Sequence, residues 1–306
     1  MKRITSILIF ISAITSVNVF AQNDIQISNF MFCGQSFNPA FAGVSRAIEF
    51  SLLVREQWVG FKTAPSTQVI NFKNSTENFG NYGLSLINDK LGYEKSLNVR
   101  LVYAYPFRLR GNSILSLGIG VGFINRSLDG TELIYENQWI TDPNGLYSLT
   151  NEYNPTIDFG GIFTNQKLTL GLSSTHISKS DVNATFFNVP RHYYFYGDYI
   201  IKASEKINVV PAVYVKSDFV ITQIEANANV HFADKFWLGC SYRVNESMVG
   251  LIGLRIFKNV KIAYAYDFNT GAVKTYSDGS HEIMIIASFD KPEKNRFYFR
   301  SPRLFN

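Results

Sequence analysis

The residues that could carry out nucleophilic chemistry are the four histidines of this 306-residue chain and the serines near them. Ser173 and Ser174 precede His176, and Ser280 directly precedes His281, so each group could pair a hydroxyl with a general base. Catalysis also needs a defined setting in which nucleophile, base and orienting group are in mutual reach. Neither group has a recognisable setting of this kind, so we expect no enzymatic activity and no cofactor.

The same side chains lack the spacing of a metal site. His281-Glu282 and Arg191-His192 are adjacent pairs, which suit hydrogen bonds that orient a loop better than metal ligation. We therefore interpret Arg191, His192 and Glu282 as structural polar residues, and expect no bound metal.

The elements that hold these residues follow one pattern, which runs from about Ile48 to Phe289. Segments of roughly ten residues alternate large apolar residues with small or polar ones, as in residues 260–268 (VKIAYAYDF). Because successive side chains of a strand face opposite sides, one face suits hydrocarbon and the other suits water. About fourteen such strands predict an all-β fold, a transmembrane antiparallel β-barrel over residues 46–290.

The connections between these strands differ in length. Short turns are expected at the periplasmic end and longer loops outside the cell. We predict the longer connections at residues 89–95, 126–153, 177–190 and 269–280. The expected inward faces are small or polar, which is compatible with water, a plug or an inserted partner segment. They include Ser116, Gly118, Gly120, Gly122, Glu225, Asn227, Asn229 and His231.

The two ends of the chain differ from the barrel in composition. Residues 1–21 have the basic start, apolar stretch and small residues of a signal peptide, which places the barrel in an outer membrane. Residues 291–306 form a basic tail. The leader carries a charge of +2 and the tail +4 against a total of +5, so the rest of the chain is nearly neutral at −1, which argues against nucleic-acid binding. The two cysteines, Cys33 and Cys240, do not form a disulfide framework.

Three segments are more specific than the barrel pattern. They read FNPAFAG at residues 37–43, REQWVGFKTAPSTQ at residues 55–68 and YSDGSHE at residues 276–282. Together they resemble the PorP/SprF family, outer-membrane components of the type IX secretion system. The chain departs from the family's usual pattern at Lys62-Thr63, at residues 31–35 and in the tail.

The resemblance implies a barrel of about fourteen strands that serves the export or surface attachment of large adhesins, as in gliding bacteria. It implies binding of the adhesin's C-terminal targeting domain, contact with other secretion components and no catalysis. Two alternatives stay open: a channel or transporter for small solutes, and a structural anchor for periplasmic partners.

The predicted partner site lies at the outer rim. In a closed barrel the first and last strands are neighbours, so the loops after the first strand and before the last should flank one seam. Exposed aromatic residues on a rigid rim are typical interface anchors, although the same residues could belong to an aromatic girdle or only shape the turns. The residues assigned to this surface are Trp58, Gly60, Phe61, Pro65, Tyr276 and His281.

Residues 22–45 precede the first strand and are expected to start on the periplasmic side. The motif residues Asn38, Pro39 and Gly43 belong to this segment. It could fold into the lumen as a plug or cover the periplasmic end as a cap. Arg55 and Asp267 are further polar residues expected to face the lumen or to serve the structure.

Overall fold

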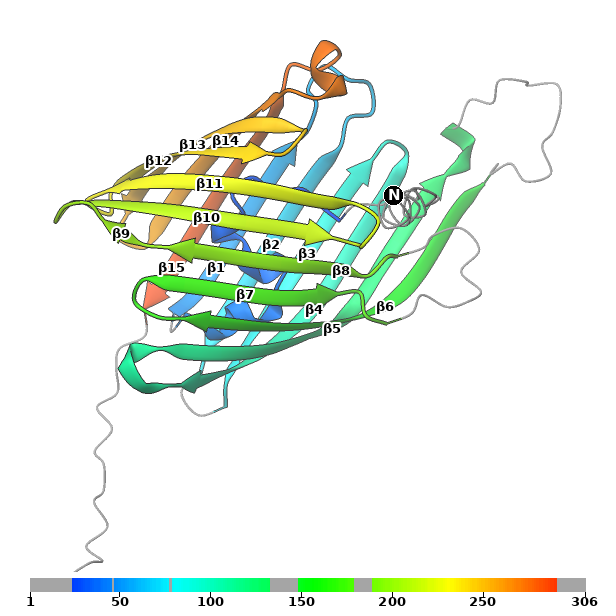
Figure 1. Ribbon diagram of the computed structural model, residues 1–306. Coiled ribbons are helices and arrows are strands. Elements are labelled where there is room, and N and C mark those ends of the chain that lie inside the picture. The colour runs from blue at the N-terminus through cyan, green and yellow to red at the C-terminus, as the bar shows by residue number, and fades with distance from the viewer. Residues whose placement is uncertain (1–23, 46, 77–78, 133–147, 179–188, 291–306) are drawn as a thin grey trace, which may run out of the picture.

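The computed structural model describes residues 24–45, 47–76, 79–132, 148–178 and 189–290, which form a closed β-barrel around a short luminal segment (Figure 1). The predicted signal peptide and basic tail lie outside the described residues. The strands in chain order are β1 (Ala47–Glu56), β2 (Ser66–Ser75), β3 (Asn81–Leu91), β4 (Glu94–Arg108), β5 (Ile114–Asp129), β6 (Leu149–Thr164), β7 (Leu168–Thr175), β8 (His192–Tyr199), β9 (Ile201–Lys202), β10 (Ile207–Ser217), β11 (Thr222–Phe232), β12 (Phe236–Arg243), β13 (Ser247–Phe257), β14 (Val260–Asn269) and β15 (Ser280–Asp290).

The sheet closes on itself without a free edge. Neighbouring strands pair antiparallel in chain order, and β1 pairs with β15 from Ala47 opposite Asp290 to Glu56 opposite His281. The short β9 continues β8 after a break at Ile200, and both pair with β10. Counting β8 and β9 as one crossing gives the predicted fourteen-stranded antiparallel barrel, and the predicted seam between first and last strands is confirmed.

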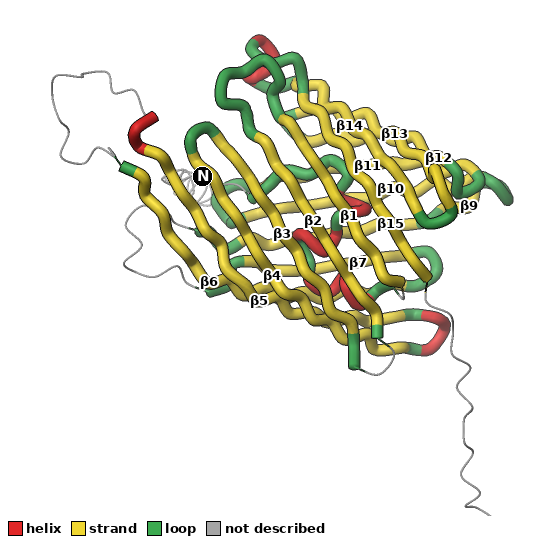
Figure 2. The backbone as a smooth tube through the Cα atoms, turned by 180° about the vertical axis from the view of Figure 1, so that it is seen from behind, coloured by secondary structure: helices red, strands yellow, loops and turns green. Residues whose placement is uncertain are grey.

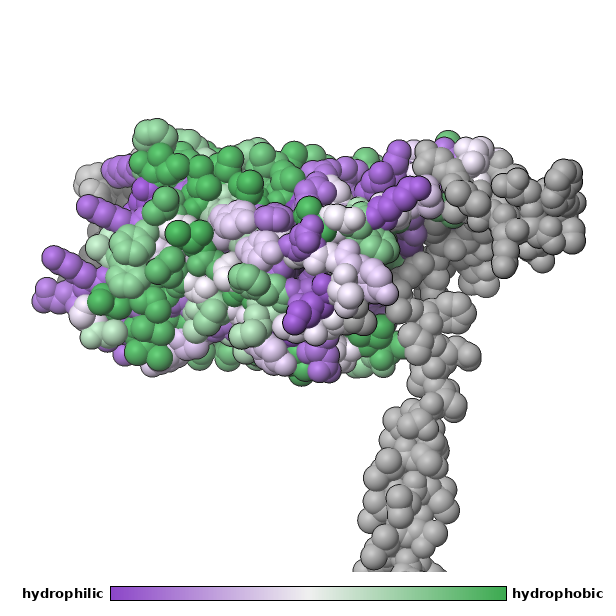
Figure 3. Space-filling view, turned by 90° about the horizontal axis from the view of Figure 1, so that it is seen from above, coloured by the Kyte–Doolittle hydropathy of each residue, from purple (hydrophilic) through white to green (hydrophobic). Residues whose placement is uncertain are grey.

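The alternation in the sequence becomes two faces of one wall. Leu101 and Leu172 project outward and are 62% and 66% exposed, whereas Ser85 and Ser116 on the inward face are fully buried. Figure 3 shows apolar side chains gathered in a broad zone that is bordered by hydrophilic ones. No helix in the described ranges is both long and apolar enough to cross a membrane.

The barrel has an inner end, where β1 begins and β15 ends, and an outer end, where the longer connections lie. One predicted long connection is wrong. Instead of a loop over residues 89–95, β3 and β4 continue to Leu91 and Glu94 and leave only Gly92 and Tyr93 between them. Gly92 has a positive φ of 65°, which suits a two-residue hairpin turn.

Residues 24–44, the luminal segment, lie inside the barrel and include three 3₁₀ turns, drawn red in Figure 2. These are η1 (Phe30–Phe32), η2 (Gly34–Ser36) and η3 (Pro39–Gly43). The segment was expected to start on the periplasmic side. Instead, Asp24 lies beside His192 at the outer end, and Ala42 lies beside Asn81 at the inner end. It therefore runs through the lumen along the barrel axis before entering β1.

Candidate functional site

The outer part of the luminal segment is held by one buried carboxylate. The two oxygens of Glu282 accept hydrogen bonds from the backbone N–H groups of Ser28 and Asn29, at 2.8 and 2.7 Å. The Asn29 side chain donates a third, at 2.8 Å. The backbone N–H groups of a segment inside a barrel have no strand to pair with and need other hydrogen-bond acceptors. For Ser28 and Asn29 the acceptor is the carboxylate of Glu282 on β15.

Two arginines complete this anchor. Arg55 of β1 donates to Asp267 at 2.8 Å and lies 3.3 Å from Glu282. Arg243 of β12 contacts Asp267 at 2.8 Å and Glu225 at 2.9 Å. All five side chains are at most 1% exposed. Buried charges of this kind are tolerated only when they are paired and hydrogen-bonded, so the five residues, each on a different strand, fix five strands relative to one another.

The Ser28 hydroxyl joins the luminal segment to the same cluster. It donates to Asp267 at 2.8 Å and accepts from Arg55 at 2.9 Å and from Arg243 at 3.2 Å. Arg55, Asp267 and Glu282, predicted as structural polar residues, thus meet at one site although they lie far apart in the chain.

Asp24 is held separately, at the outer end. Lys216 donates to the backbone oxygen of Asp24 at 2.8 Å, and the Tyr194 hydroxyl donates to the Asp24 carboxylate. Burial alone would raise the pKa of Asp24, but the neighbouring imidazoles of His176, 3.8 Å away, and His192, with the hydrogen bond from Tyr194, hold it well below its usual range. Asp24 is therefore an ionised anchor.

The middle of the segment packs by aromatic contact. Phe30 stacks on Tyr214 with ring centroids 5.0 Å apart, and Phe37 meets the same ring edge-on at 5.0 Å. Phe41 contacts Tyr196 at 5.5 Å. Aromatic pairs at these distances add stability beyond the burial of their area, so this part of the lumen is filled by side chains.

The motif residues Asn38, Pro39 and Gly43 lie at η3. The Asn38 side chain accepts from Ala40 N–H at 2.9 Å, which caps the turn, and it donates to the Leu172 carbonyl at 3.2 Å. The wall approaches closely enough to require glycine. A Cβ on Gly118 would lie 2.4 Å from the Ala40 nitrogen. Gly118 of β5 therefore makes room for η3.

A further ion pair ties the segment to β4 and β6. Arg100 lies 2.7 Å from Asp158 and donates to the backbone oxygen of Ser36 at 2.5 Å. The thiol of Cys33 is enclosed nearby, and burial raises its pKa to about 12. Such a thiol is neutral and inert at ordinary pH.

The outer rim carries the other predicted site. The loops of residues 57–65 and 270–279 lie side by side above the β1–β15 seam, blue and orange in Figure 1. Backbone hydrogen bonds join Val59 N–H to the Gly279 oxygen at 2.9 Å and Asp278 N–H to the Val59 oxygen at 2.8 Å. Phe61 is 49% and Tyr276 71% exposed. The two loops therefore form one platform with exposed aromatic rings.

The remaining rim residues have other surroundings. Trp58 is partly buried at a positive φ of 49°, and its N–H donates to the Ser280 hydroxyl. Gly60, at a φ of 91°, lies against Asp278, where a Cβ would come within 3.2 Å of the carboxylate. Pro65 is buried. These three residues shape the platform.

Two predicted residues point elsewhere. His281 follows the outward face of β15, where its Nδ1 lies 2.7 Å from the Tyr264 hydroxyl and its ring meets Tyr266 edge-on. Arg191 is exposed and donates to the Ile177 oxygen at 2.9 Å. His281 thus belongs to an aromatic group on the wall and does not line the platform.

The serine and histidine groups have structural partners. Ser173 donates to the Phe37 oxygen at 2.7 Å, and the Nδ1 of His176 lies 3.0 Å from the Thr156 hydroxyl. Within the described ranges no group of three His, Cys, Asp or Glu side chains is arranged to hold a metal ion.

The family model of the type IX secretion system membrane protein PorP/SprF matches residues 19–286. The chain belongs to the PorP/SprF family. Membership places it in the outer membrane and implies other components of the secretion system as partners. The matched region includes both the luminal segment and the platform.

Solved structures similar to this PorP/SprF chain are outer-membrane barrels of low identity. The toluene transporter TbuX of Ralstonia pickettii is 11% identical, with a TM-score of 0.49 over 83% of this chain and 92% of that one. The outer membrane protein Omp33 of Acinetobacter baumannii is 8% identical, with a TM-score of 0.47 over 80% and 99%. Among curated proteins, no sequence matches.

The residues of this PorP/SprF barrel that sequence reasoning missed are charged and face inward. Arg243 shares the lumen side of β12 with Ser241, and Arg100 and Lys216 occupy equivalent faces of β4 and β10. The sequence did contain a signal for them, which is a charged residue on the face of a strand that otherwise carries small residues. This signal does not identify the partners of each charge, because the partners lie on other strands or on the luminal segment.

Proposed function

We propose that this outer-membrane protein serves the export or surface attachment of large adhesins by binding their C-terminal targeting domain at the platform of residues 57–65 and 270–279. The observation that carries the proposal is the pairing of two loops from opposite ends of the chain. Their backbone bonds hold Phe61 and Tyr276 on a rigid support, and rigid exposed aromatic residues are suited to be interface anchors.

The occupied lumen favours this role over that of an open channel. Residues 24–44 run through the lumen along the barrel axis, with aromatic rings packed against Tyr194, Tyr196 and Tyr214. A solute would need a path past these side chains. We therefore propose a binding role without catalysis, and expect little steady conductance in a planar bilayer.

The test is the double variant Phe61→Ser/Tyr276→Ser. Cells that carry it should lose most of the adhesin domain from their surface, because hot-spot anchors account for much of an interface's affinity. The matched control is Phe219→Ser/Tyr153→Ser, which removes a phenylalanine and a tyrosine that are 78% and 68% exposed elsewhere near the outer end. The control should retain the adhesin. Normal display in the platform variant, with the barrel folded, would rule out docking there.

A further inference from the structure

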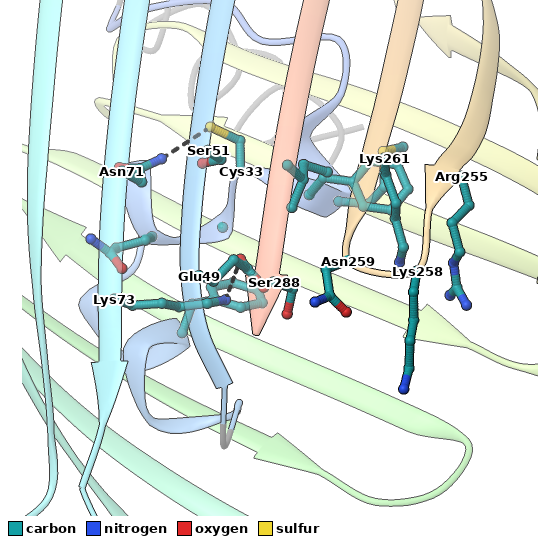
Figure 4. Close-up of a pocket in the computed structure, with 16 residues that line it drawn as sticks. Cys33, Glu49, Ser51, Asn71, Lys73, Arg255, Lys258, Asn259, Lys261 and Ser288 are labelled. Carbon is teal, nitrogen blue, oxygen red and sulfur yellow. Dashed lines mark hydrogen bonds and ion pairs between the residues drawn. The ribbon is translucent and has the colours of Figure 1, made fainter. Parts of the chain in front are cut away.

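A cavity of about 420 Å³ lies between the luminal segment and the barrel wall toward the inner end (Figure 4). Its wall comes from β1, β2, β13, β14 and β15. On the other side it is bordered by apolar side chains of the luminal segment, namely Met31, Phe32 and Phe41. It therefore offers apolar and charged surface to the same ligand.

Cations outnumber carboxylates around this inner cavity. Lys73 is paired with Glu49, the one carboxylate of the lining, at 2.7 Å. Arg255, Lys258 and Lys261 also line it, and none of the three forms an ion pair within the described part of the chain. In Figure 4 the side chains of Arg255 and Lys258 extend together, in the direction in which β15 ends.

The register makes this excess costly without a ligand. Arg255 and Lys261 are directly opposite each other on β13 and β14, and like charges in opposite positions destabilise an antiparallel pair. An anionic group between them would remove the repulsion, and hydrogen bonds from charged donors to a carboxylate are strong.

The direction of these side chains limits where the anion comes from. Arg255 and Lys261 continue the inward faces that Gly253 and Ala263 begin. Arg255 and Lys258 are exposed at the inner rim, so the cavity opens toward the periplasm, and headgroups that lie against the outer surface of the wall do not face this opening. The chain's own tail is unsuitable as well, because residues 291–306 contain five lysines and arginines and one glutamate.

We propose that the inner cavity binds an acidic segment of a periplasmic polypeptide, with carboxylates at Arg255, Lys258 and Lys261 and an apolar side chain against Phe32 and Phe41. The volume lies within the range of ligand sites, roughly 300–1,000 Å³, and suits a few side chains. A polypeptide offers carboxylates and apolar side chains together, as this lining requires. The site is distinct from the platform, at the opposite end of the barrel.

The test uses the purified full chain in detergent and a fluorescent peptide that alternates glutamate and leucine. The triple variant Arg255→Glu/Lys258→Glu/Lys261→Glu should weaken binding at least tenfold, read by fluorescence anisotropy. The matched control is Lys167→Glu/Lys206→Glu/Lys235→Glu, which makes the same charge change on exposed turns of the inner end outside the cavity. It should change the affinity less than twofold.

Three results would overturn the proposal. Equal loss in the control would mean attraction by overall charge alone. If a glutamine–leucine peptide bound as tightly as the glutamate–leucine peptide, the carboxylates would have no role in binding. Competition by soluble peptidoglycan fragments or inorganic phosphate as effective as that of the peptide would assign the cavity to another anion. Folding of each variant is checked by its heat-modifiable mobility in gel electrophoresis. If the triple variant does not fold, the single variant Lys258→Glu is used in its place, with Lys206→Glu as its control. Cells that carry the cavity variants should still display the adhesin. A negative result for peptide binding would therefore not contradict the proposed role of the platform.

Discussion

The luminal segment is held in two different ways along its length. Residues 24–29 are fixed by charged side chains, namely Lys216, Glu282 and the two arginines that share Asp267. Residues 30–43 are fixed mainly by ring packing and by close backbone approach at η3, with a single ion pair, Arg100 with Asp158, behind Ser36. Ionic anchors depend on pH and on complete pairing, whereas packed contacts depend on shape. The comparison therefore predicts that different changes release the two parts.

Removing an arginine from the ionic part should have the largest effect. Arg243→Ala leaves the carboxylates of Glu225 and Asp267 buried with fewer partners, and breaking a buried pair in this way costs about 3–5 kcal/mol. The measurement is the urea midpoint of the folded barrel. A second measure is hydrogen exchange at residues 24–29, where the N–H groups of Ser28 and Asn29 should lose protection when the cluster is broken.

The control for this change is Arg191→Ala, which removes an exposed cation at the outer end and should cost well under about 1 kcal/mol. If the urea midpoint and the exchange at residues 24–29 are the same in both variants, the cluster does not anchor the segment.

A smaller loss is expected from overfilling the packed part. Gly118→Ala puts a methyl group 2.4 Å from the Ala40 nitrogen, and overpacking of this kind costs about 1–3 kcal/mol. Gly161→Ala is the matched control, because its Cβ would meet its nearest neighbour at 3.5 Å, an ordinary contact. The urea midpoints of the two variants give the difference, and equal midpoints would mean that η3 does not press on β5.

Acid should separate the two parts with the smallest overall effect. The folded-state pKa of Asp24 is lowered, so its contribution is complete above the unfolded value of about 3.9 and is lost as pH falls through the folded one. Hydrogen exchange read by mass spectrometry should show residues 24–29 losing protection below about pH 4, while residues 34–43 keep theirs. Asp24→Asn should make exchange at residues 24–29 much less dependent on pH, and an unchanged pH profile in that variant would contradict the assignment.

The sequence alone determined the wall of this protein. Alternation with a period of two fixes which side chains face lipid, and the even number of crossings follows from turns that return the chain to its starting end. Short-range patterns of this kind survive without tertiary contacts, so the strand count and the β1–β15 seam could be predicted. The loop at residues 89–95 was misjudged because Gly92 permits a tighter turn than its polar neighbours suggested.

Only the tertiary structure decided what fills the barrel. Residues 24–44 have no alternation, and their partners are separated from them by as many as 254 positions, as in Ser28 with Glu282. The inward charge of Arg243 or Lys216 could be read from strand periodicity, but its partner could not, because inward residues of all the strands meet in one lumen. Which of them meet depends on the register of the closed sheet and on the path of the luminal segment through it.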